Sequence, residues 1–514
     1  MTKSFTTDVL VCGAGAAGLT LAIDLARRGV AFRLIEKMPV PFAGSRGKGI
    51  QPRSQEVFED LGVIDRLVAA GGAYPPQRSY RADGTYEDED IFELGKPTPA
   101  EPYQIPLMVP QFLTEAVLRE RLAELGHRPA FGCELTAFTQ DKHGITATVA
   151  DMKGKPAIRA RYLVGADGGR SFVRRTLGID FPGQTLGVRA IVADLLVDGV
   201  SRDAWHRWGE GSGEQISLCP LAGTEMFQLQ GPIPLEGDID LSAAGLTALL
   251  AARTGRKDIV VRSVSWASAF QMNARIAERY RVGRAFLVGD AAHVHPPTGG
   301  QGLNTSVQDS YNLGWKLAAV LRGAPEKLLA TYEEERRPIA AEMLGLTTGL
   351  LEAAKQGSMR RGREVHQLDI GYPQSSLRLE QPPRSGGVLA GDRAPDAPIR
   401  GAAGLPARLF NLFEGPHWTL LGFGVDRLGG AAPRAGLHIH AVGPHGDIAD
   451  DEGHFRAAYG LTPGDWVLVR PDGYIGAIVS SANLPALESY LESVGLVRDD
   501  APAASRGWFR FRKA

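Results

Sequence analysis

Cysteine is nearly absent from this sequence: its 514 residues contain three, Cys12, Cys133 and Cys219. They are far apart and odd in number, and none belongs to a Cys-x-x-Cys pair. This pattern argues against a disulfide framework, a zinc ribbon and a dithiol redox centre. Net charge is lacking too: its formal value is -1 at pH 7, so no general attraction for nucleic acid is expected. The expected partner is a small molecule.

Long apolar runs are also missing. No window holds the ~18 consecutive apolar residues that a membrane span needs, and residues 1–7 are polar where a secretory signal would be positively charged and then apolar. The sequence therefore predicts a cytoplasmic protein with no membrane partner. The apolar fraction of 44% and the charged fraction of 22% are those of globular proteins. Because 514 residues are too many for one hydrophobic core, two or three domains are expected.

Two segments have the pattern of a strand followed by a helix. Near the start, an apolar strand over 9–12 is followed by a glycine turn, a helix predicted over about 17–28 and a second strand over 32–35. Later, a strand over 285–288 ends in a Gly-Asp pair, crosses a Pro/Gly loop and enters a helix predicted over about 303–321. The two units are typical of one cofactor-binding domain.

Between these units the pattern changes to short strands separated by Gly, Pro and Asp, which predicts a sheet domain interleaved with the first domain. The clearest strands are 190–197, 226–230 and 259–270. Residues 371–387 are rich in Pro, Ser, Gly and Arg and have no clear periodic pattern, so they are predicted to be a linker. Short strands from 388 onward, followed by an amphipathic helix, predict a small α/β layer.

The first turn reads Gly13-x-Gly15-x-x-Gly18 between a strand and a helix, the context in which this pattern indicates dinucleotide binding. Gly13 permits the tight turn, Gly15 lets the backbone approach a pyrophosphate, and Gly18 allows close helix packing. Glu36 ends the second strand, where a carboxylate binds ribose hydroxyls and repels a 2′-phosphate. FAD or NAD is therefore favoured over NADP. The alternative is a glycine-rich turn with no ligand.

Two further motifs distinguish FAD from NAD. They are Gly165-Ala166-Asp167-Gly168-Gly169-Arg170-Ser171-x-Val173-Arg174, and Gly289-Asp290-Ala291-Ala292-His293 continuing through Pro296-Pro297-Thr298-Gly299-Gly300-Gln301-Gly302-Leu303-Asn304. Both resemble the second and third fingerprints of the class A FAD-dependent aromatic hydroxylases, the family of para-hydroxybenzoate hydroxylase and phenol hydroxylase. The resemblance covers most of residues 1–345 and extends through Gln308-Asp309, Asn312-Leu313-Gly314-Trp315-Lys316-Leu317 and Glu335-Arg336-Arg337-Pro338.

The resemblance implies an α/β fold with three parts. A Rossmann-like FAD-binding domain is expected over 1–75, 103–185 and 275–370, interleaved with a mixed-sheet substrate-binding domain over 76–102 and 186–274. After the linker, residues 388–514 resemble the thioredoxin-like domain appended to the polyketide-tailoring members of this family. The Cys-x-x-Cys motif is missing there because the last cysteine is Cys219. Residues 388–514 are therefore expected to serve in packing or in oligomerisation, for example in a homodimer.

The family's FAD contacts fall on residues of these motifs. Asp290 ends a strand, where its carboxylate can accept a hydrogen bond from a ribityl or ribose hydroxyl, unless it is only a helix or turn cap. The loop 296–302 has few side chains, so its backbone can approach a flat ring, and the helix behind it points its positive end at a reduced flavin. Asp167 resembles a residue that contacts FAD, although an Asp-Gly turn has the same pattern. Residue by residue, the predicted FAD contacts are Gly13, Gly15, Ala17, Gly18, Glu36, Lys37, Arg46, Gln111, Arg119, Leu135, Asp167, Asp290, Pro297, Gly300, Gln301, Gly302, Leu303 and Asn304.

Substrate contacts are predicted on the interleaved sheet. In Val264-x-Trp266-x-Ser268-x-Phe270 large side chains share one face of a strand, and Phe227 and Gln228 lie on a second strand. Such a face suits an aromatic substrate, but it suits an ordinary core equally well. The candidate substrate residues are Phe227, Gln228, Trp266 and Phe270.

A metal site is not expected. His293 and His295 form a His-x-His pair, but we expect their side chains to project to opposite sides, and no acidic or Cys partner joins them in the sequence.

The resemblance also implies the reaction. FAD is reduced by NADPH or NADH, which binds only transiently, and then reacts with O2 to a C4a-hydroperoxyflavin that delivers OH to an activated ring carbon. We therefore expect a monooxygenase that hydroxylates an aromatic, phenolic or polyketide-like substrate, with no catalytic residue assigned. The motifs leave Baeyer-Villiger insertion, epoxidation and oxidative inactivation of an aromatic antibiotic open. From another class, a non-catalytic flavin redox sensor also stays open.

Overall fold

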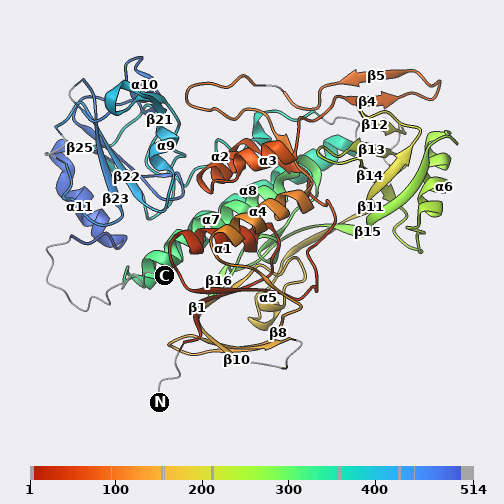
Figure 1. Ribbon diagram of the computed structural model, residues 1–514, viewed down its shortest axis with the longest axis horizontal. Helices are drawn as coiled ribbons and strands as arrows, with labels where there is room; N and C mark the ends of the chain where they lie inside the picture. Colours follow the sequence, from red (N-terminus) through yellow and green to blue (C-terminus); the bar gives the residue numbers. More distant parts are fainter. Residues whose placement is uncertain are drawn as a thin grey trace.

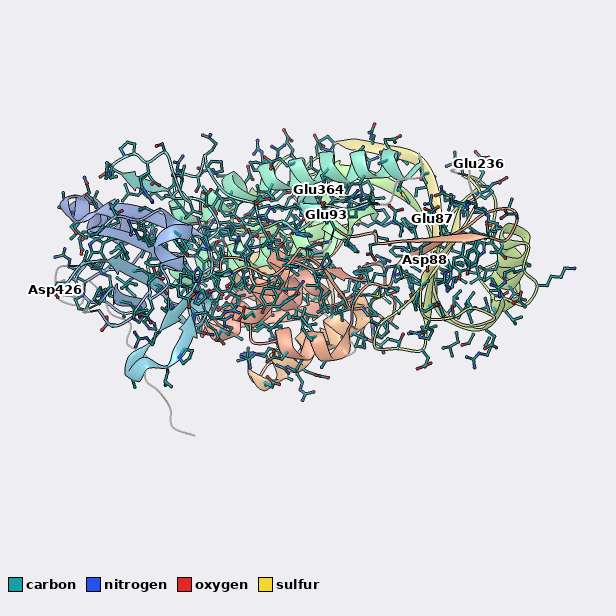
Figure 2. The ribbon with its side chains drawn as sticks, turned by 90° about the horizontal axis from the view of Figure 1, so that it is seen from above. Glu87, Asp88, Glu93, Glu236, Glu364 and Asp426 are labelled. Atoms are coloured by element: carbon teal, nitrogen blue, oxygen red, sulfur yellow. The ribbon has the colours of Figure 1, made fainter. Side chains whose placement is uncertain are left out.

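The computed structural model describes residues 5–93, 95–151, 154, 157–209, 213–355, 360–426, 430–444 and 446–498. The end of the predicted C-terminal domain, 499–514, lies outside the described residues. Three large sheets surround a central stack of helices: one lies below the stack, and the other two lie toward opposite ends of the long axis (Figure 1). Seen from above, Asp426 of the C-terminal layer lies near one end of this axis and Glu236 of the sheet domain lies near the other (Figure 2).

The first sheet is the predicted dinucleotide-binding layer. At its centre β1 (Thr7–Cys12) is parallel to β10 (Ala157–Gly165) on one side and to β2 (Phe32–Glu36) on the other. The parallel order continues to β17 (Ala285–Leu287) and β7 (Ala130–Phe131). Antiparallel strands complete the sheet: β8 (Glu134–Gln140), β9 (Ile145–Ala150) and β16 (Arg281–Val282). The carboxyl ends of β1, β2, β10 and β17 therefore meet at one edge.

Helices pack beside this sheet (Figure 1). The helix predicted over 17–28 is α1 (Ala16–Arg27), and it packs against α4 (Gln111–Glu124) and α7 (Gln301–Leu321), the helix predicted over 303–321. The apolar side chains of α1, such as Leu19 and Ile23, have no exposed surface, so burial of its apolar face holds the layer together. The remaining helices here are α2 (Pro52–Asp60), α3 (Ile64–Ala70), α5 (Phe172–Thr176) and α8 (Ala330–Lys355).

The second sheet is the interleaved domain. Its order is β18-β15-β11-β14-β13-β12-β4-β5, and its long central pair, β11 (Gly183–Asp198) and β15 (Val260–Ile276), is antiparallel. Helix α6 (Ala243–Thr254) covers the outer face over an apolar core. The other strands are β4 (Gln77–Tyr80), β5 (Tyr86–Glu89), β12 (Trp205–Trp208), β13 (Ile216–Pro220), β14 (Phe227–Ile233) and β18 (His293–Val294). Strands β4 and β5, which precede the central pair by about a hundred residues, and β18, which follows it, thus join the same sheet.

The third sheet forms the C-terminal layer, in the order β19-β25-β24-β22-β23. Its strands are β19 (Leu379–Gln381), β22 (Trp418–Phe423), β23 (Leu437–Val442), β24 (Asp465–Val469) and β25 (Ile475–Ser480). Short helices and a β-hairpin flank it: β20 (Pro398–Arg400), β21 (Pro406–Arg408), α9 (Leu409–Phe413), α10 (His454–Tyr459) and α11 (Leu484–Ser493). Apolar cores lie on both sides of the sheet. The fold class expected from the sequence is confirmed, whereas the thioredoxin-like assignment of this layer stays a prediction.

The predicted linker 371–387 is wrong in its centre. Residues 379–381 form the edge strand β19, which pairs in parallel with residues 477–479 of β25. Tyr372 and Leu377 are buried nearby, and the hydroxyl of Tyr490 donates a 2.9 Å hydrogen bond to the carbonyl of Leu377. The Pro- and Ser-rich composition of residues 371–387 is typical of a loop, but pairing with β25 makes residues 379–381 a strand.

The C-terminal layer shares a buried interface with α7 and α8. Glu335 of α8 accepts hydrogen bonds from Arg470 (2.7 Å) and from Lys316 of α7 (2.6 Å). The indole of Trp315 donates to Asp472 at 2.9 Å, and its ring packs edge-on against Trp418. These charged groups are almost fully buried, which is tolerated only because each has a partner of opposite charge. The layer is therefore packed onto the helices.

Two short strands, β3 (Gly49–Ile50) and β6 (Leu107–Met108), pair beside the central helices. Among the described helices, none combines the length and the apolar character that a membrane crossing requires.

Candidate active site

A cavity of about 2560 Å³ lies between the carboxyl edge of the first sheet and the inner face of the second. A site for one small molecule usually measures ~300–1,000 Å³, so this cavity has room for two ligands. Its walls include the turn after β1, the end of β2, the turn after β10, the loop 294–303 and strands of the second sheet. The carboxyl edge of a parallel sheet is where such folds bind their ligands.

The three glycines of the first turn have different surroundings. A Cβ on Gly13 would lie 2.1 Å from the carbonyl oxygen of Ala166, and one on Gly18 would lie 1.9 Å from that of Gly13. Gly13 also has a φ of +108°, which side chains rarely allow. A Cβ on Gly15 would meet only Glu115 Oε1, at 3.7 Å. Two glycines thus permit close packing, and the third leaves backbone open to a pyrophosphate, as FAD requires.

Glu36 is held beside this turn by backbone donors. Its Oε2 accepts a hydrogen bond from the N–H of Ala14 and its Oε1 accepts one from the N–H of Met38, both at 2.9 Å. Each oxygen keeps a lone pair with which to accept from a ribose hydroxyl. Lys37, the next residue, is exposed and lines the same part of the cavity.

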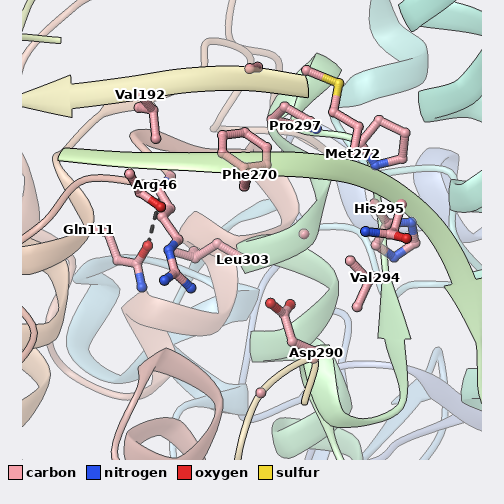
Figure 3. A pocket seen from close by; sticks show the side chains of 18 of the residues that line it. Arg46, Gln111, Val192, Phe270, Met272, Asp290, Val294, His295, Pro297 and Leu303 are labelled. Atoms are coloured by element: carbon pink, nitrogen blue, oxygen red, sulfur yellow. Dashed lines mark hydrogen bonds between the residues drawn. The ribbon is translucent and has the colours of Figure 1, made fainter. Parts of the chain in front are cut away.

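Arg46 and Gln111 point into the cavity where the two sheets meet (Figure 3). The guanidinium carbon of Arg46 lies 5.9 Å from the centroid of the Trp266 ring. The amide of Gln111 accepts from the N–H of Gly47 (3.3 Å) and donates to Glu115 (2.8 Å). These contacts hold the segment around Arg46 against α4. Leu135 of β8 also lines the cavity, among the residues that follow β7.

Asp167 lines the cavity, but its carboxylate is bound to the protein itself. Oδ2 accepts from the backbone N–H groups of Phe172 (2.7 Å) and Val173 (3.1 Å), and Oδ1 accepts from Ser171 Oγ (2.5 Å). The side chain therefore caps the start of α5, a role that neither the expected FAD contact nor the alternative Asp-Gly turn had included. The surrounding turn, 166–170, faces the cavity.

The loop before α7 presents mainly backbone to the cavity. Gly299 and Gly300 have φ angles of +80° and +65°, and a Cβ on Gly302 would meet no protein atom within 4 Å. The first residues of the 21-residue helix α7 line the cavity directly behind them, so the positive end of its dipole points at the space. Asp290 projects into the cavity from the other side of this loop (Figure 3).

Three of the predicted FAD contacts do not line the cavity: Gly18, Arg119 and Asn304. Gly18 acts through packing, as above. The buried amide of Asn304 accepts from the N–H of Gln51 at 2.8 Å and donates to the carbonyl of Gly49 at 2.9 Å, so it holds the loop in place. Arg119 lies one turn beyond Glu115, with 3.9 Å between their charged groups. None of the three lies on the cavity wall, and their contact with FAD stays a prediction.

Two predicted substrate residues are also misplaced. Phe227 is 2% exposed and packs in the outer core under α6, because the alternation along β14 turns it away from the cavity. Gln228 faces inward but is covered: it accepts a 2.7 Å hydrogen bond from Lys48 Nζ and donates to Ser45 Oγ at 2.8 Å. The prediction that these two line the substrate space is wrong.

Trp266 and Phe270 do line the cavity from β15, and Met272 continues the same face (Figure 3). Extending the alternation by two residues would have found Met272. The rest of this wall comes from distant segments and was missed. Its residues include Lys48, Tyr74, Gln77, Val192, Trp205, Arg207, Gln230 and Arg361.

The two histidines correct another expectation. His293 and His295 do not point apart, because residues two positions apart on an extended segment share one face. Nδ1 of His293 lies 2.9 Å from Nε2 of His295, and an acidic partner exists, since His293 Nε2 lies 2.7 Å from Asp309. Asp309 in turn accepts from Arg336 at 2.9 Å. Burial and the neighbouring His293 lower the pKa of His295 to about 3, so its ring is neutral beside the cavity. Within the described ranges, no group of three or more His, Cys, Asp or Glu could hold a metal ion.

Glu115 was missed by the sequence reasoning. It is 2% exposed, lines the cavity beside Gly15, and follows Gln111 by one helical turn. Burial raises its pKa to about 7, while hydrogen bonding to Gln111 and the charge of Arg119 act in the opposite direction. A carboxyl next to the predicted pyrophosphate site can thus be neutral near physiological pH.

Comparisons with known proteins agree with this geometry. A family model described as "FAD binding domain" matches residues 6–347. The flavin-dependent monooxygenase of Mycobacteroides abscessus is 43% identical over 92% of this chain and 97% of the relative. The 12-dehydrotetracycline 5-monooxygenase/anhydrotetracycline 6-monooxygenase of Streptomyces rimosus subsp. rimosus is 33% identical over 91% of this chain and 94% of the relative.

Among solved structures, a ternary complex of aklavinone-11 hydroxylase with FAD and aklavinone superposes with a TM-score of 0.84 at 28% identity, covering 96% of this chain and 99% of that one. The OxyS anhydrotetracycline hydroxylase from Streptomyces rimosus superposes with a TM-score of 0.76 at 30% identity, covering 95% and 99%.

Proposed function

Because the chain belongs to the FAD-binding-domain family and is an FAD-dependent monooxygenase, we propose that it hydroxylates a fused-ring phenolic substrate of the polyketide type with NADPH or NADH and O2. One observation carries the proposal. A single cavity of about 2560 Å³ has a dinucleotide-binding wall and, opposite it, a wall with aromatic side chains. That arrangement suits a flavin and a flat substrate in contact with each other.

The relatives support the same substrate class. Their names refer to anhydrotetracycline and aklavinone. Trp266 and Phe270 offer apolar surface for such rings, while Gln77 of β4 and Gln230 of β14 offer hydrogen bonds to ring substituents.

FAD, when bound, would accept the hydride and activate O2. The protein's task is to bind and orient. The turn around Gly15 would hold the pyrophosphate, Glu36 would accept from ribose, and the N-terminus of α7 would stabilise negative charge on the ring system. The second sheet covers the space and restricts water, which favours oxygen transfer over loss of peroxide. The homodimer and the cytoplasmic location stay predictions.

The test uses the FAD-loaded protein with NADPH or NADH, in the presence and absence of anhydrotetracycline, aklavinone and a one-ring phenol. Nicotinamide oxidation, H2O2 release and product mass under ¹⁸O2 are followed together. We expect a fused-ring compound to accelerate oxidation many-fold, with little peroxide and one ¹⁸O atom in a hydroxyl group.

The other outcomes are distinct. An ester or lactone oxygen in the product would show Baeyer-Villiger chemistry, and an epoxide would show that the enzyme is an epoxidase. If no compound accelerates oxidation while the flavin spectrum stays intact, the substrate class is wrong and the redox-sensor alternative is favoured.

A further inference from the structure

Lys48 is a buried cation on the substrate side of the cavity. It lies between the segment that carries Arg46 and the short strand β3, and only 8% of its surface is exposed. It is nevertheless one of the residues that line the cavity. Its ammonium lies 4.0 Å from the centroid of the Trp205 ring, on the wall opposite the dinucleotide turn. The side chain therefore reaches the part of the cavity that an aromatic ligand would fill.

The direct partners of this ammonium carry no negative charge. Nζ donates to the neutral amide of Gln228 at 2.7 Å, and that amide oxygen also accepts from Gln230 at 2.6 Å. The charge of the Asp194 carboxylate acts on Lys48, but both oxygens of this carboxylate accept hydrogen bonds from Ser45. Among the residues that the structure describes, no carboxylate forms an ion pair with Lys48.

A buried charge is costly unless it has an opposite charge beside it. Every other strongly buried cation described above has such a partner: Lys316 and Arg470 share Glu335, and Arg336 binds Asp309. Burial lowers the pKa of Lys48, and the neighbouring Cys219 and, to a smaller extent, the charge of Asp194 only partly offset this effect. An anion entering the cavity would supply the missing partner.

The surroundings select the kind of anion. Arg207, two residues after Trp205 on β12, adds positive charge to the same wall. Cys219 faces Lys48, and burial raises the pKa of its thiol; burial also raises the pKa of Tyr74, which lines the cavity. Two acidic residues, Glu236 and Asp238, also line the cavity, but they belong to the segment that follows β14. Glu236 lies near the outer end of the molecule (Figure 2). A lysine is a point charge that suits a single oxygen, whereas carboxylates and phosphates are better matched by the two-pronged guanidinium.

We propose that Lys48 binds the ionised oxygen of a phenol or enol on the fused-ring substrate. This inference rests on the proposed function, because the substrate must be aromatic and must lie against the second sheet. Lys48 then orients the ring by its oxygen, with Trp205 beneath the ammonium and Phe270 along the ring. The aromatic wall alone would not distinguish a phenol from its methyl ether.

The probe is 1,2-dihydroxyanthraquinone, a fused-ring phenol whose visible absorption moves to longer wavelength than that of flavin when a hydroxyl ionises. It is titrated into the FAD-loaded wild type and Lys48→Met at a pH where the free dye is mostly neutral. Lys142→Met, a change of the same type at an exposed loop, is the matched control. Lys48→Gln is a second neutral variant that keeps a polar end, and urea unfolding checks both.

In the wild type and in Lys142→Met, the bound dye is expected to be ionised, with a ratio of ionised to neutral form at least about 10-fold above that of the free dye, since an opposite charge within 4–6 Å shifts a pKa by ~1–3 units. Both Lys48 variants should bind the dye in its neutral form. A neutral dye in the wild type, an ionised dye in the Lys48 variants, or no binding to the wild type would each overturn the inference.

Failure of this inference and failure of the proposed function give different results. If Lys48→Met hydroxylates a fused-ring substrate with unchanged KM and kcat, the role of Lys48 is wrong and the monooxygenase proposal stands. If the dye binds ionised only in the presence of Lys48 but no fused-ring compound is oxygenated, the anion site stands and the proposed reaction is wrong.

Discussion

The two walls of the cavity are built from different material. The dinucleotide wall consists of backbone: glycine turns after β1 and before α7, helix N-termini, and a few carboxylates held by N–H groups. The opposite wall consists of large side chains, such as Trp205 and Phe270, brought together from segments far apart in the chain. The first kind of wall needs particular residues at fixed spacing, because glycine and capping residues act locally. The second needs only suitable size and polarity at positions that the fold determines.

The largest effect is expected from adding one methyl group to the backbone wall. Gly13→Ala would place a Cβ 2.1 Å from the Ala166 carbonyl at a φ of +108°. We expect the protein to lose more than about 3 kcal/mol of unfolding free energy, and to be purified without flavin. Urea unfolding and the flavin absorbance per protein measure both.

Gly345→Ala is the matched control for this change. Gly345 lies within α8, where a Cβ would meet no atom within 4 Å. Its flavin content should equal that of the wild type, and helix propensity should raise stability by ~0.5–1 kcal/mol. Equal flavin retention by the two glycine variants would contradict the account of the first wall.

A pH-dependent effect is expected from the titrating group on the backbone wall. The pKa of Glu115 is raised from an ordinary carboxyl value to about 7, so the folded apoprotein binds a proton that the unfolded chain releases at lower pH. Stability should therefore fall as pH rises through this window, by up to about 3 kcal/mol.

Glu115→Gln removes this dependence. Unfolding of apoprotein at pH 5 and pH 8 should show the variant gaining over the wild type mainly at pH 8, and FAD should bind it more tightly there, because no carboxylate faces the pyrophosphate. A wild type and a variant with parallel pH profiles would mean that Glu115 is ionised throughout.

A smaller effect is expected from Gly302→Ala, which tests whether a glycine of the backbone wall serves ligand binding without serving protein packing. A Cβ on Gly302 meets no protein atom, so Gly302→Ala should leave unfolding of the apoprotein unchanged. If the flavin ring lies against this loop, the methyl group occupies ligand space, and the Kd for FAD should rise about tenfold, equivalent to ~1.4 kcal/mol. Fluorescence titration of FAD measures it. Unchanged affinity would place the ring away from the loop.

The smallest effect is expected on the side-chain wall. Phe270 lines the cavity and is only partly buried, so Phe270→Ala should cost little stability and retain FAD. Loss of its ring should raise the KM of a fused-ring substrate by roughly 5- to 10-fold, or about 1 kcal/mol of binding. Steady-state kinetics, with the flavin content of each preparation measured, distinguishes weaker substrate binding from loss of cofactor. Loss of FAD from the variant would show that the two walls are not independent.

The same contrast explains what could be predicted from the sequence. The turns at Gly13 and Gly300 and the helices behind them follow from local patterns, and the structure places them together at one edge of the sheet. Strand β19 was missed because its pairing with β25 depends on residues almost a hundred positions away. Lys48 and Trp205 form one contact although they are more than 150 residues apart in the chain, and no spacing rule connects them. The misplacement of Phe227 shows that alternation identifies two faces of a strand without saying which is the inner one.

The most direct test of the two-wall account is a crystal structure of the protein with FAD and a fused-ring phenol bound. The account predicts the pyrophosphate at the Gly13–Gly18 turn, the isoalloxazine ring against residues 297–302, and the phenol between that ring and Phe270. A ring system that lies against the second sheet without contacting the loop before α7, or a phenol bound outside this cavity, would contradict it.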